Sequence, residues 1–344
     1  MPVKRAVRIL IGLAAVVALA VASIGFRANS FLNSPVTVAA DGASFEITSG
    51  SAFAQVSNNL ADLGIIEHPD FFRWYARFTG MAGAVHAGEY EIAAGTTPKQ
   101  LLLKFVSGEV LLYSMTIVEG WNFRELMAAI QASSLLEHTI VYEDWPATLE
   151  AFKAEATHPE GLFLPETYRF PKGTTDVGLL QQAFDLMQTT LDDEWAGRDE
   201  GLPIATPYEA LILASIIEKE TALASERPRI AGVFTRRLQK RMRLQTDPTV
   251  IYGIGVDFNG NLTRRDMRTD TPYNTYTRRG LPPTPIALPG KAAIHAAVHP
   301  EAGTELYFVA TGLGDGSHKF SETKAEHDAA VQEYLVRLRA ARNK

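Results

Sequence analysis

The sequence predicts an α+β fold in which one membrane-spanning helix precedes two globular units. Three observations lead to this prediction. The chain has 344 residues, 46% of them hydrophobic, which is enough for more than one average domain. An uncharged apolar run occupies Ile9–Phe26. Beyond it, segments with the period of a strand alternate with segments that have the period of a helix.

The composition also limits which partners we expect. The formal net charge is -6, and the chain has no cysteine. A surface that binds nucleic acid needs a strong excess of basic residues, so we expect no nucleic-acid partner. Without cysteine the chain cannot form disulfides, and packing alone must hold any exported part together.

The apolar run predicts a single-pass helix in the cell inner membrane, across residues 9–26. Its length is near the lower limit for crossing a hydrocarbon core of about 30 Å. Basic residues precede it at Lys4, Arg5 and Arg8. The positive-inside rule therefore keeps residues 1–8 in the cytoplasm and sends the rest of the chain into the periplasm.

A cleaved signal peptide is the alternative, because Ala20-Val21-Ala22 resembles a cleavage site. We favour a retained membrane helix because the apolar run continues to Phe26. Small polar residues are frequent over 27–42, as in a short juxtamembrane linker.

Residues 43–118 are predicted to form the first, smaller α+β unit. Alternation of apolar and polar residues indicates strands, and apolar residues at helical spacing indicate helices. The expected order is strand, helix, helix, strand, helix and strand, at 43–48, 52–63, 71–78, 87–92, 97–105 and 111–118.

Residues 119–344 are predicted to form the second, larger unit. Its loop Gly161–Tyr168 mixes apolar and aromatic residues with Gly and Pro, which suits an ordered loop beside a cleft. Strands 306–310 and 317–320 are expected to form a hairpin. Helices are expected from Asn122 to Ile130, from Val177 to Trp195, from Thr206 to Thr221, after an N-cap at Ser225, from Lys291 to Val298, and after an N-cap at Thr323 with Glu326.

The helix that begins at Thr206 is the most distinctive element. Thr206 is a good N-cap, Pro207 suits the first helical position, and Glu209 completes a capping box. From Ala210 to Ile217 only Ser215 is polar, which is typical of a helix buried on all sides.

Glu218 leaves this core at the end of the helix, on the stripe that buries Leu211. Partial desolvation and the negative end of the helix dipole both favour its protonated form, so Glu218 is a candidate general acid. The alternative is that Glu218, Lys219 and Glu220 are only a solvated charged end.

Two further segments carry polar side chains. The stretch Leu244–Gly290 is long for a structureless loop, and such loops are usually functional. Its hydroxyl, amide and aromatic groups suit a sugar site, although a polar connector is the alternative. Arg229, Arg236, Arg237 and Lys240 lie opposite an apolar stripe, and we interpret them as a solvated helix face.

We expect no metal and no cofactor. His295, His299, His318 and His327 are interpreted as scattered structural histidines, since H-E-x-x-H and cysteine ligands are absent. Phosphate-binding glycine motifs and a G-x-S-x-G nucleophile elbow are absent as well.

Several segments together resemble the endolytic murein transglycosylases of the MltG/YceG-like family. With the membrane helix and the first unit, the resemblance covers nearly the whole chain. The segments that carry it are Leu213–Thr221, Leu244–Gly253, Tyr273–Tyr276, Gly280–Pro283, Ala296–Pro300 and Tyr307–Ala310.

The resemblance implies a lytic transglycosylase that cuts peptidoglycan glycan strands between N-acetylmuramic acid and N-acetylglucosamine without water. It implies a LysM-like glycan-binding module at 43–118, for which a plain packing domain is an equal alternative. It also implies that the enzyme ends the elongation of nascent strands, with peptidoglycan synthases as partners. A non-catalytic wall-binding scaffold on the membrane is the alternative from another class.

Glu218 stands at the catalytic glutamate of the family, and it would act as acid and then as base to leave a 1,6-anhydro end. We expect six further residues to bind or support substrate, namely Gln245, Thr246, Tyr273, Asn274, Thr275 and Glu220.

Overall fold

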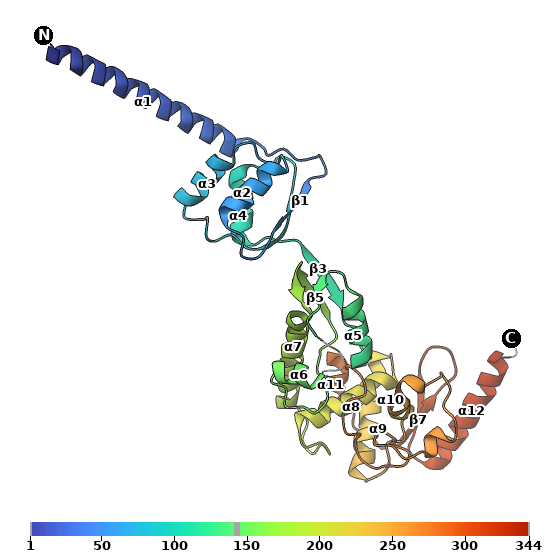
Figure 1. Ribbon diagram of the computed structural model, residues 1–344. Coiled ribbons are helices and arrows are strands. Elements are labelled where there is room, and N and C mark those ends of the chain that lie inside the picture. Colours follow the sequence, from blue (N-terminus) through green and yellow to red (C-terminus); the bar gives the residue numbers. More distant parts are fainter. Residues whose placement is uncertain (1, 141–144, 343–344) are drawn as a thin grey trace. The chain divides into compact units, whose positions relative to one another are not determined.

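A computed structural model describes residues 2–140 and 145–342, and its chain divides into two compact units (Figure 1). Unit 1 comprises residues 1–113 and 170–173, and unit 2 comprises 114–169 and 174–344. The mixed helix and strand content confirms the predicted α+β class.

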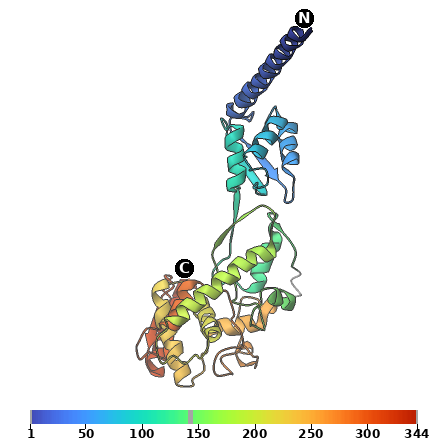
Figure 2. The same cartoon turned by 90° about the vertical axis from the view of Figure 1, so that its left-hand side faces the viewer.

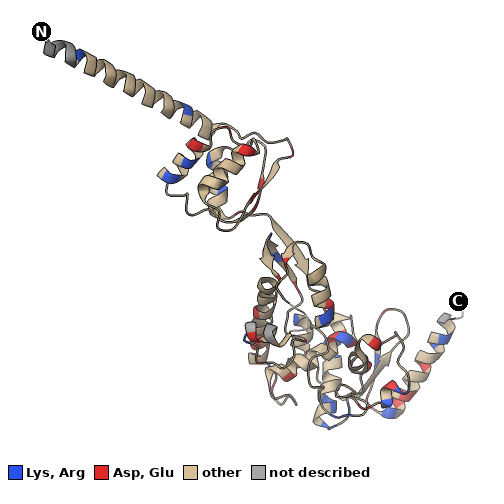
Figure 3. Ribbon diagram, in the orientation of Figure 1, with Lys and Arg blue, Asp and Glu red and all other residues tan. Residues whose placement is uncertain are grey.

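The first helix, α1, runs over Pro2–Asn33 and is longer than the predicted 9–26. Within its stretch Val7–Asn33, the most apolar window of 18 residues has a mean hydropathy of 2.7, and no residue of that window is buried. The helix is therefore long and apolar enough to cross a membrane, as a signal sequence also is. In Figure 3 the coloured charged positions of this helix lie only towards its two ends. The helix includes part of the predicted linker, because polar side chains cap its last turns: Asn33 Nδ2 donates to the Asn29 carbonyl (2.6 Å).

Unit 1 contains the first five elements predicted for residues 43–118, in the predicted order, and the sixth predicted element is the strand β3 (Leu112–Thr116), described below. Strand β1 (Ala43–Ile47) pairs antiparallel with β2 (Gly88–Ile92), and three helices pack beside this pair. Its hydrophobic core contains Phe72, Tyr90 and Phe105, all fully buried. The helices are α2 (Phe53–Asp62), α3 (Pro69–Phe78) and α4 (Pro98–Ser107). The assignment of this unit to the LysM-like class stays a prediction.

Unit 2 is mainly helical, and every sheet among the described residues has only two strands. The strand pairs are β3 (Leu112–Thr116) with β5 (Thr167–Pro171), β4 (Leu136–Glu137) with β6 (Thr174–Thr175), and the predicted hairpin β7 (Tyr307–Ala310) with β8 (His318–Ser321). The α-helices are α5 (Phe123–Ala132), α6 (Trp145–Ala151), α7 (Asp176–Ala196), α8 (Pro207–Glu220), α9 (Arg227–Gln239), α10 (Asp247–Ile254), α11 (Lys291–Val298) and α12 (Lys324–Arg342).

Helix α8 lies at the centre of unit 2, and both views show it surrounded by other elements (Figures 1 and 2). It contacts α7, α9, α10 and α11. Ala210–Ile217 are all buried, which confirms the prediction of a helix buried on all sides. Ser215, its polar exception, donates its hydroxyl to the Ile212 carbonyl (2.7 Å) and accepts from the Ile286 amide (3.0 Å). A buried hydroxyl is tolerated here because it is hydrogen-bonded.

Two predicted caps need correction. Ser225 is wrong as an N-cap, because it lies in a short 3-10 helix, Ala224–Glu226, and α9 begins at Arg227 with Pro228 in its first turn. The capping box of α8 is half formed. Thr206 Oγ1 accepts from the Glu209 amide (3.2 Å), but the Glu209 carboxylate accepts from Ala205 instead of Thr206.

The polar stretch 244–290 is more ordered than predicted. It contains α10 and two 3-10 helices, Gly255–Asp257 and Asp266–Arg268. The run Thr246-Asp247-Pro248 is a helix start, with an N-cap position followed by an acidic residue and Pro in the first turn. These residue types also favour turns, which is why the sequence predicted a loop here.

The predicted solvated face of α9 is also partly wrong. Arg237 is 7% exposed, and its guanidinium donates to the carbonyls of Leu306 (2.6 Å) and Leu244 (2.7 Å). Arg236 donates to the carbonyls of Glu305 and Glu301. A guanidinium is buried where its fork of donors finds carbonyl partners, and spacing along α9 does not reveal those partners.

Truncation on either side of strand β3 tests where unit 2 begins. A chain that starts at the predicted boundary, Glu119, lacks both β3 and Ile117, which is 1% exposed and donates its amide to the Glu166 carbonyl (3.0 Å). We expect that chain to be less stable than one starting at Leu112 by about 2–5 kcal/mol, since it leaves β5 unpaired and removes a buried isoleucine. Calorimetry of both chains measures this, and equal melting temperatures would show that β3 is dispensable.

Candidate active site

Glu218 lies in the last turn of α8, and its side chain is only 5% exposed. Both carboxyl oxygens have partners. The Arg227 guanidinium donates to Oε1 (2.8 Å), and the Gly290 amide donates to Oε2 (3.0 Å). The carboxyl group is therefore held in one orientation at the point where the buried helix ends.

Arg227 serves two carboxylates at once. The same guanidinium nitrogen that contacts Glu218 lies 3.2 Å from Oε2 of Glu119. Arg227 itself is 8% exposed, and its Nε atom is buried without a hydrogen-bond partner among the described residues. The Glu119 side chain is 47% exposed and is partly solvated, whereas the Glu218 side chain is 5% exposed and depends on the cation that the two carboxylates share.

This environment raises the pKa of Glu218. Burial of the carboxyl is the main cause, and the charge of Glu119 acts in the same direction. The Gly290 amide and the Arg227 guanidinium favour the ionised form and oppose the shift. A raised pKa keeps a larger fraction of Glu218 protonated near neutral pH, as a general acid requires.

Two segments far apart in the sequence meet beside this carboxyl group. The Gly120 amide donates to the Leu288 carbonyl (2.9 Å), and the Leu288 amide donates to the Trp121 carbonyl (2.6 Å). A Cβ atom on Gly290 would clash with Oε1 of Glu119. Gly290 therefore lets a backbone amide and a second carboxylate approach Glu218 together.

Glu220 points to a different side of α8. The Thr246 hydroxyl donates to its Oε1. Burial raises the pKa of Glu220 to about 7, with the Thr246 hydrogen bond opposing the shift and the charge of Asp247 adding to it. Glu218 and Glu220 thus belong to separate polar clusters at the end of one helix.

The structure brings together the two polar segments that the sequence predicted to carry site residues. The Gln245 amide donates to the Thr275 carbonyl (3.2 Å), and the Thr246 amide donates to Thr275 Oγ1 (3.1 Å). Gln245 has a φ of 54°, a left-handed conformation that is uncommon for residues other than glycine. Its side chain is exposed, whereas Thr246 and Thr275 are buried.

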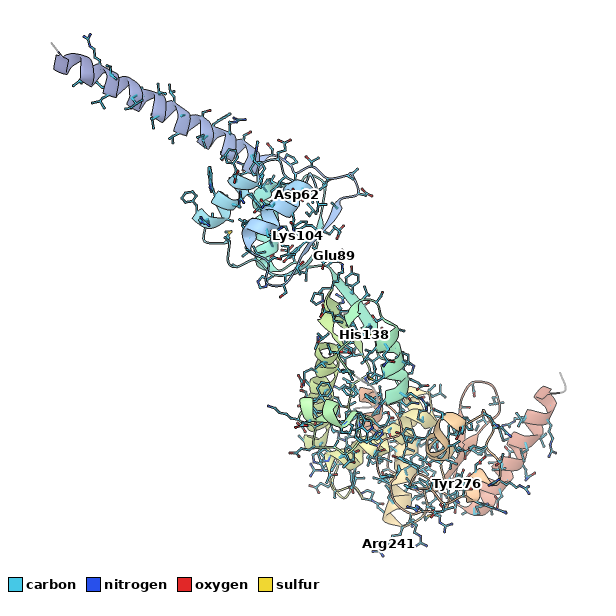
Figure 4. The ribbon with its side chains drawn as sticks, viewed as in Figure 1. Asp62, Glu89, Lys104, His138, Arg241 and Tyr276 are labelled. Atoms are coloured by element: carbon cyan, nitrogen blue, oxygen red, sulfur yellow. The ribbon has the colours of Figure 1, made fainter. Side chains whose placement is uncertain are left out.

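Asn274 and Tyr273 are engaged inside the protein. Asn274 is fully buried, and its Nδ2 donates to the carbonyls of Thr269 (2.7 Å) and Asp266 (3.1 Å). Tyr273 is half-buried, and its hydroxyl lies 2.9 Å from Thr284 Oγ1. The nearby Tyr276 (Figure 4) donates to Asp247. Substrate binding by the predicted residues stays a prediction.

Sequence patterns did not reveal one buried carboxyl group, that of Glu160. It is 2% exposed and accepts from the Phe123 amide and the Tyr252 hydroxyl, each at 2.9 Å. Burial raises the pKa of Glu160 to about 8, against the effect of both hydrogen bonds. Glu160 immediately precedes the predicted loop Gly161–Tyr168, and that position is the signal that could have found it.

The histidines that were predicted to be scattered are not all isolated. His318 Nδ1 lies 2.7 Å from the Glu226 carboxylate. His295 and His299 lie side by side on α11, with ring centroids 4.4 Å apart. Their spacing of four residues equals that of the two histidines in H-E-x-x-H, and this spacing is the signal that could have paired them.

Replacing Glu160 by Gln should flatten the dependence of stability on pH. Since burial raises its folded-state pKa to about 8, the stability that Glu160 contributes is fully present below its ordinary pKa of 4.5 and is lost as the pH rises through about 8. In that window the wild type should lose up to about 1.4 kcal/mol per pH unit through this group, and the neutral amide should lose none of it.

Thermal unfolding from about pH 4.5 to about pH 9 measures the effect across this window. Glu166→Gln changes an exposed carboxylate in the neighbouring loop and serves as the control. Parallel curves for wild type and Glu160→Gln would contradict the assignment.

Comparisons with known proteins agree with this architecture. The model of the YceG-like family matches residues 45–333. A protein of Bacillus subtilis (strain 168) named endolytic murein transglycosylase is 31% identical over 84% of each chain. A protein of the same name from Streptococcus pneumoniae is 26% identical, over 84% of this chain and 58% of its own length.

A solved structure is similar as well. A YceG-like protein of Listeria monocytogenes has 28% sequence identity and a TM-score of 0.53, over 85% of this chain and 99% of the other. The family model extends over all of the segments described around Glu218. This chain therefore belongs to the YceG-like family, as its sequence motifs predicted.

Proposed function

We propose that this chain is an endolytic lytic transglycosylase that cleaves the glycan strands of peptidoglycan between N-acetylmuramic acid and N-acetylglucosamine. The names of its relatives support the reaction class. The single observation that carries the proposal is the buried carboxyl of Glu218, fixed by Arg227 and the Gly290 amide at the end of α8.

The first step needs an acid. Glu218 gives its proton to the glycosidic oxygen as the bond from that oxygen to C1 of the muramic acid breaks, through an oxocarbenium-like transition state. Because its pKa is raised, Glu218 keeps the proton that this step needs, and Arg227 stabilises the carboxylate that remains. The departing N-acetylglucosamine keeps the proton as its new hydroxyl group.

The second step needs a base in the same place. The Glu218 carboxylate takes the proton of the C6 hydroxyl of the muramic acid, and that oxygen bonds to C1 and closes a 1,6-anhydro ring. Water is neither consumed nor released, and Glu218 ends the cycle protonated. A hydrolase of the lysozyme type needs a second carboxylate opposite the first. Glu220 is a poor candidate, because it lies on another side of the helix and is bonded to Thr246.

Gln245 is the residue that we propose contacts the glycan directly among those chosen from the sequence. Its side chain is exposed, and its backbone is held in a left-handed conformation by the bond to Thr275. Such conformations persist where the surroundings determine them, often at binding sites. The floor of the proposed glycan-binding groove is then formed by Thr246, Tyr273, Asn274 and Thr275. Glu220 supports this floor by accepting a hydrogen bond from the Thr246 hydroxyl.

We further propose that α1 holds the enzyme in the cell inner membrane with both units in the periplasm, where it ends nascent strands beside peptidoglycan synthases. The length of α1 and the basic residues in its first turns, ahead of its apolar stretch, support this location. A reporter that works only in the periplasm should be active when it is fused to the C-terminus of this chain. The fusion protein should remain in the membrane fraction. Recovery of a soluble chain cut near Ala22 would contradict retention of the helix.

Glu218→Gln should abolish most activity and leave the fold intact. The amide keeps the shape of the side chain but cannot exchange the proton, and general acid-base catalysis contributes about 10²- to 10⁴-fold, with a larger loss expected when one residue does both steps. The release of soluble fragments from purified peptidoglycan, analysed by mass spectrometry, measures it. The wild-type product should carry an anhydro end, lighter than a hydrolysis product by one water.

Glu220→Gln is the matched control, since it makes the same change two residues further along the same helix, and it should be clearly less affected. Near-normal turnover by Glu218→Gln, or reducing muramic acid ends from the wild type, would overturn the mechanism. Binding to peptidoglycan without any release by the wild type would favour the scaffold alternative.

A further inference from the structure

We propose that Glu194, His295 and His299 form a binding site for a divalent cation of the zinc class, on the surface of unit 2. Each residue offers one ligand atom, and these three atoms lie within 4.8 Å of one another. The site is separate from the cluster around Glu218 and does not depend on the proposed reaction.

The two histidines come from successive turns of α11. Residues four positions apart lie on the same face of a helix, which is how helical zinc motifs present an imidazole pair. Here the ring centroids are 4.4 Å apart. Side-chain exposure of 57% for His295 and 26% for His299 leaves the pair open to a cation from solvent.

Two carboxylates approach these rings from the end of α7 and the turn after it. Glu194 Oε2 lies 2.7 Å from Nδ1 of His295, and its side chain is only 13% exposed. Asp199 Oδ1 lies 2.9 Å from Nδ1 of His299. The Asp199 amide also donates to the Val298 carbonyl (3.0 Å), so this turn is held against the end of α11.

These contacts assign a role to each residue. A hydrogen bond from Nδ1 of His299 to Asp199 fixes the tautomer that leaves Nε2 with its lone pair, the arrangement in which a carboxylate orients a metal-binding histidine. Glu194 is the third ligand, and water completes the coordination. Two imidazoles with one carboxylate suit zinc, whereas magnesium and calcium prefer oxygen ligands.

A bound cation would fasten the end of α7 to α11. Helix α11 packs against α8 along much of its length, and α8 carries Glu218. The site would therefore stabilise the helices beneath the catalytic centre and take no part in the reaction.

The test uses the full chain in detergent, without a histidine tag and after removal of metals with a chelator. Titration with ZnCl₂ in a calorimeter should show one ion per chain. Zinc at about 100 times its dissociation constant should raise the melting temperature by roughly 5–10 °C. His295→Ala and His299→Ala should each lose the saturable binding and the thermal shift.

Asp199→Asn distinguishes an orienting carboxylate from a bystander, and it should weaken zinc binding about 10- to 100-fold with the fold unchanged. His138→Ala removes a histidine that bonds to the Ser133 carbonyl and should bind zinc as the wild type does. Wild-type chain that binds no zinc stoichiometrically, or His295→Ala and His299→Ala variants that bind it normally, would overturn the proposal.

Discussion

The pairing of Glu218 with Arg227 is the interaction on which the architecture of unit 2 depends. Helix α8 is apolar along its buried length except for Ser215, and the charge at its end is acceptable only because a cation and an amide meet it there. Removing the cation from such a pair typically costs about 3–5 kcal/mol, since it leaves an uncompensated buried charge. The charges in this arrangement are nevertheless unequal, because Arg227 is shared with Glu119.

The sharing of Arg227 between two carboxylates affects both the stability of the folded chain and the affinity of Glu218 for its proton. A carboxyl group paired with a cation of its own would stay ionised and could not serve as an acid. A carboxyl group buried alone would keep its proton and would be a poor base afterwards. Glu218 lies between these limits, since burial and Glu119 favour the proton while Arg227 and the Gly290 amide favour its loss. One residue can act in both directions only if neither form is strongly preferred.

Sequence patterns predicted those features that depend on local order. The apolar run of α8, its N-cap at Thr206 and the hairpin β7–β8 follow from periodicity and capping, which neighbouring residues determine. The position of Glu218 at the helix end followed in the same way. Patterns failed where the partner is distant: Arg227 and Glu160 are polar residues whose burial is set by other segments. Spacing along the chain does not identify those partners, and the same holds for the buried Arg237, whose guanidinium donates to the Leu306 carbonyl.

The four residues at the centre, Glu119, Glu218, Arg227 and Gly290, are widely separated along the chain, and their meeting has a consequence for the order of folding. Contacts between distant segments form late, because the intervening chain must first be ordered. Domains form as the chain is synthesised from its N-terminus. Until Gly290 has emerged, the carboxyl of Glu218 lacks the amide that fixes its second oxygen. A chain that ends before Gly290 therefore carries an unassembled centre, and the surroundings of Glu218 are complete only when almost all of unit 2 has been made.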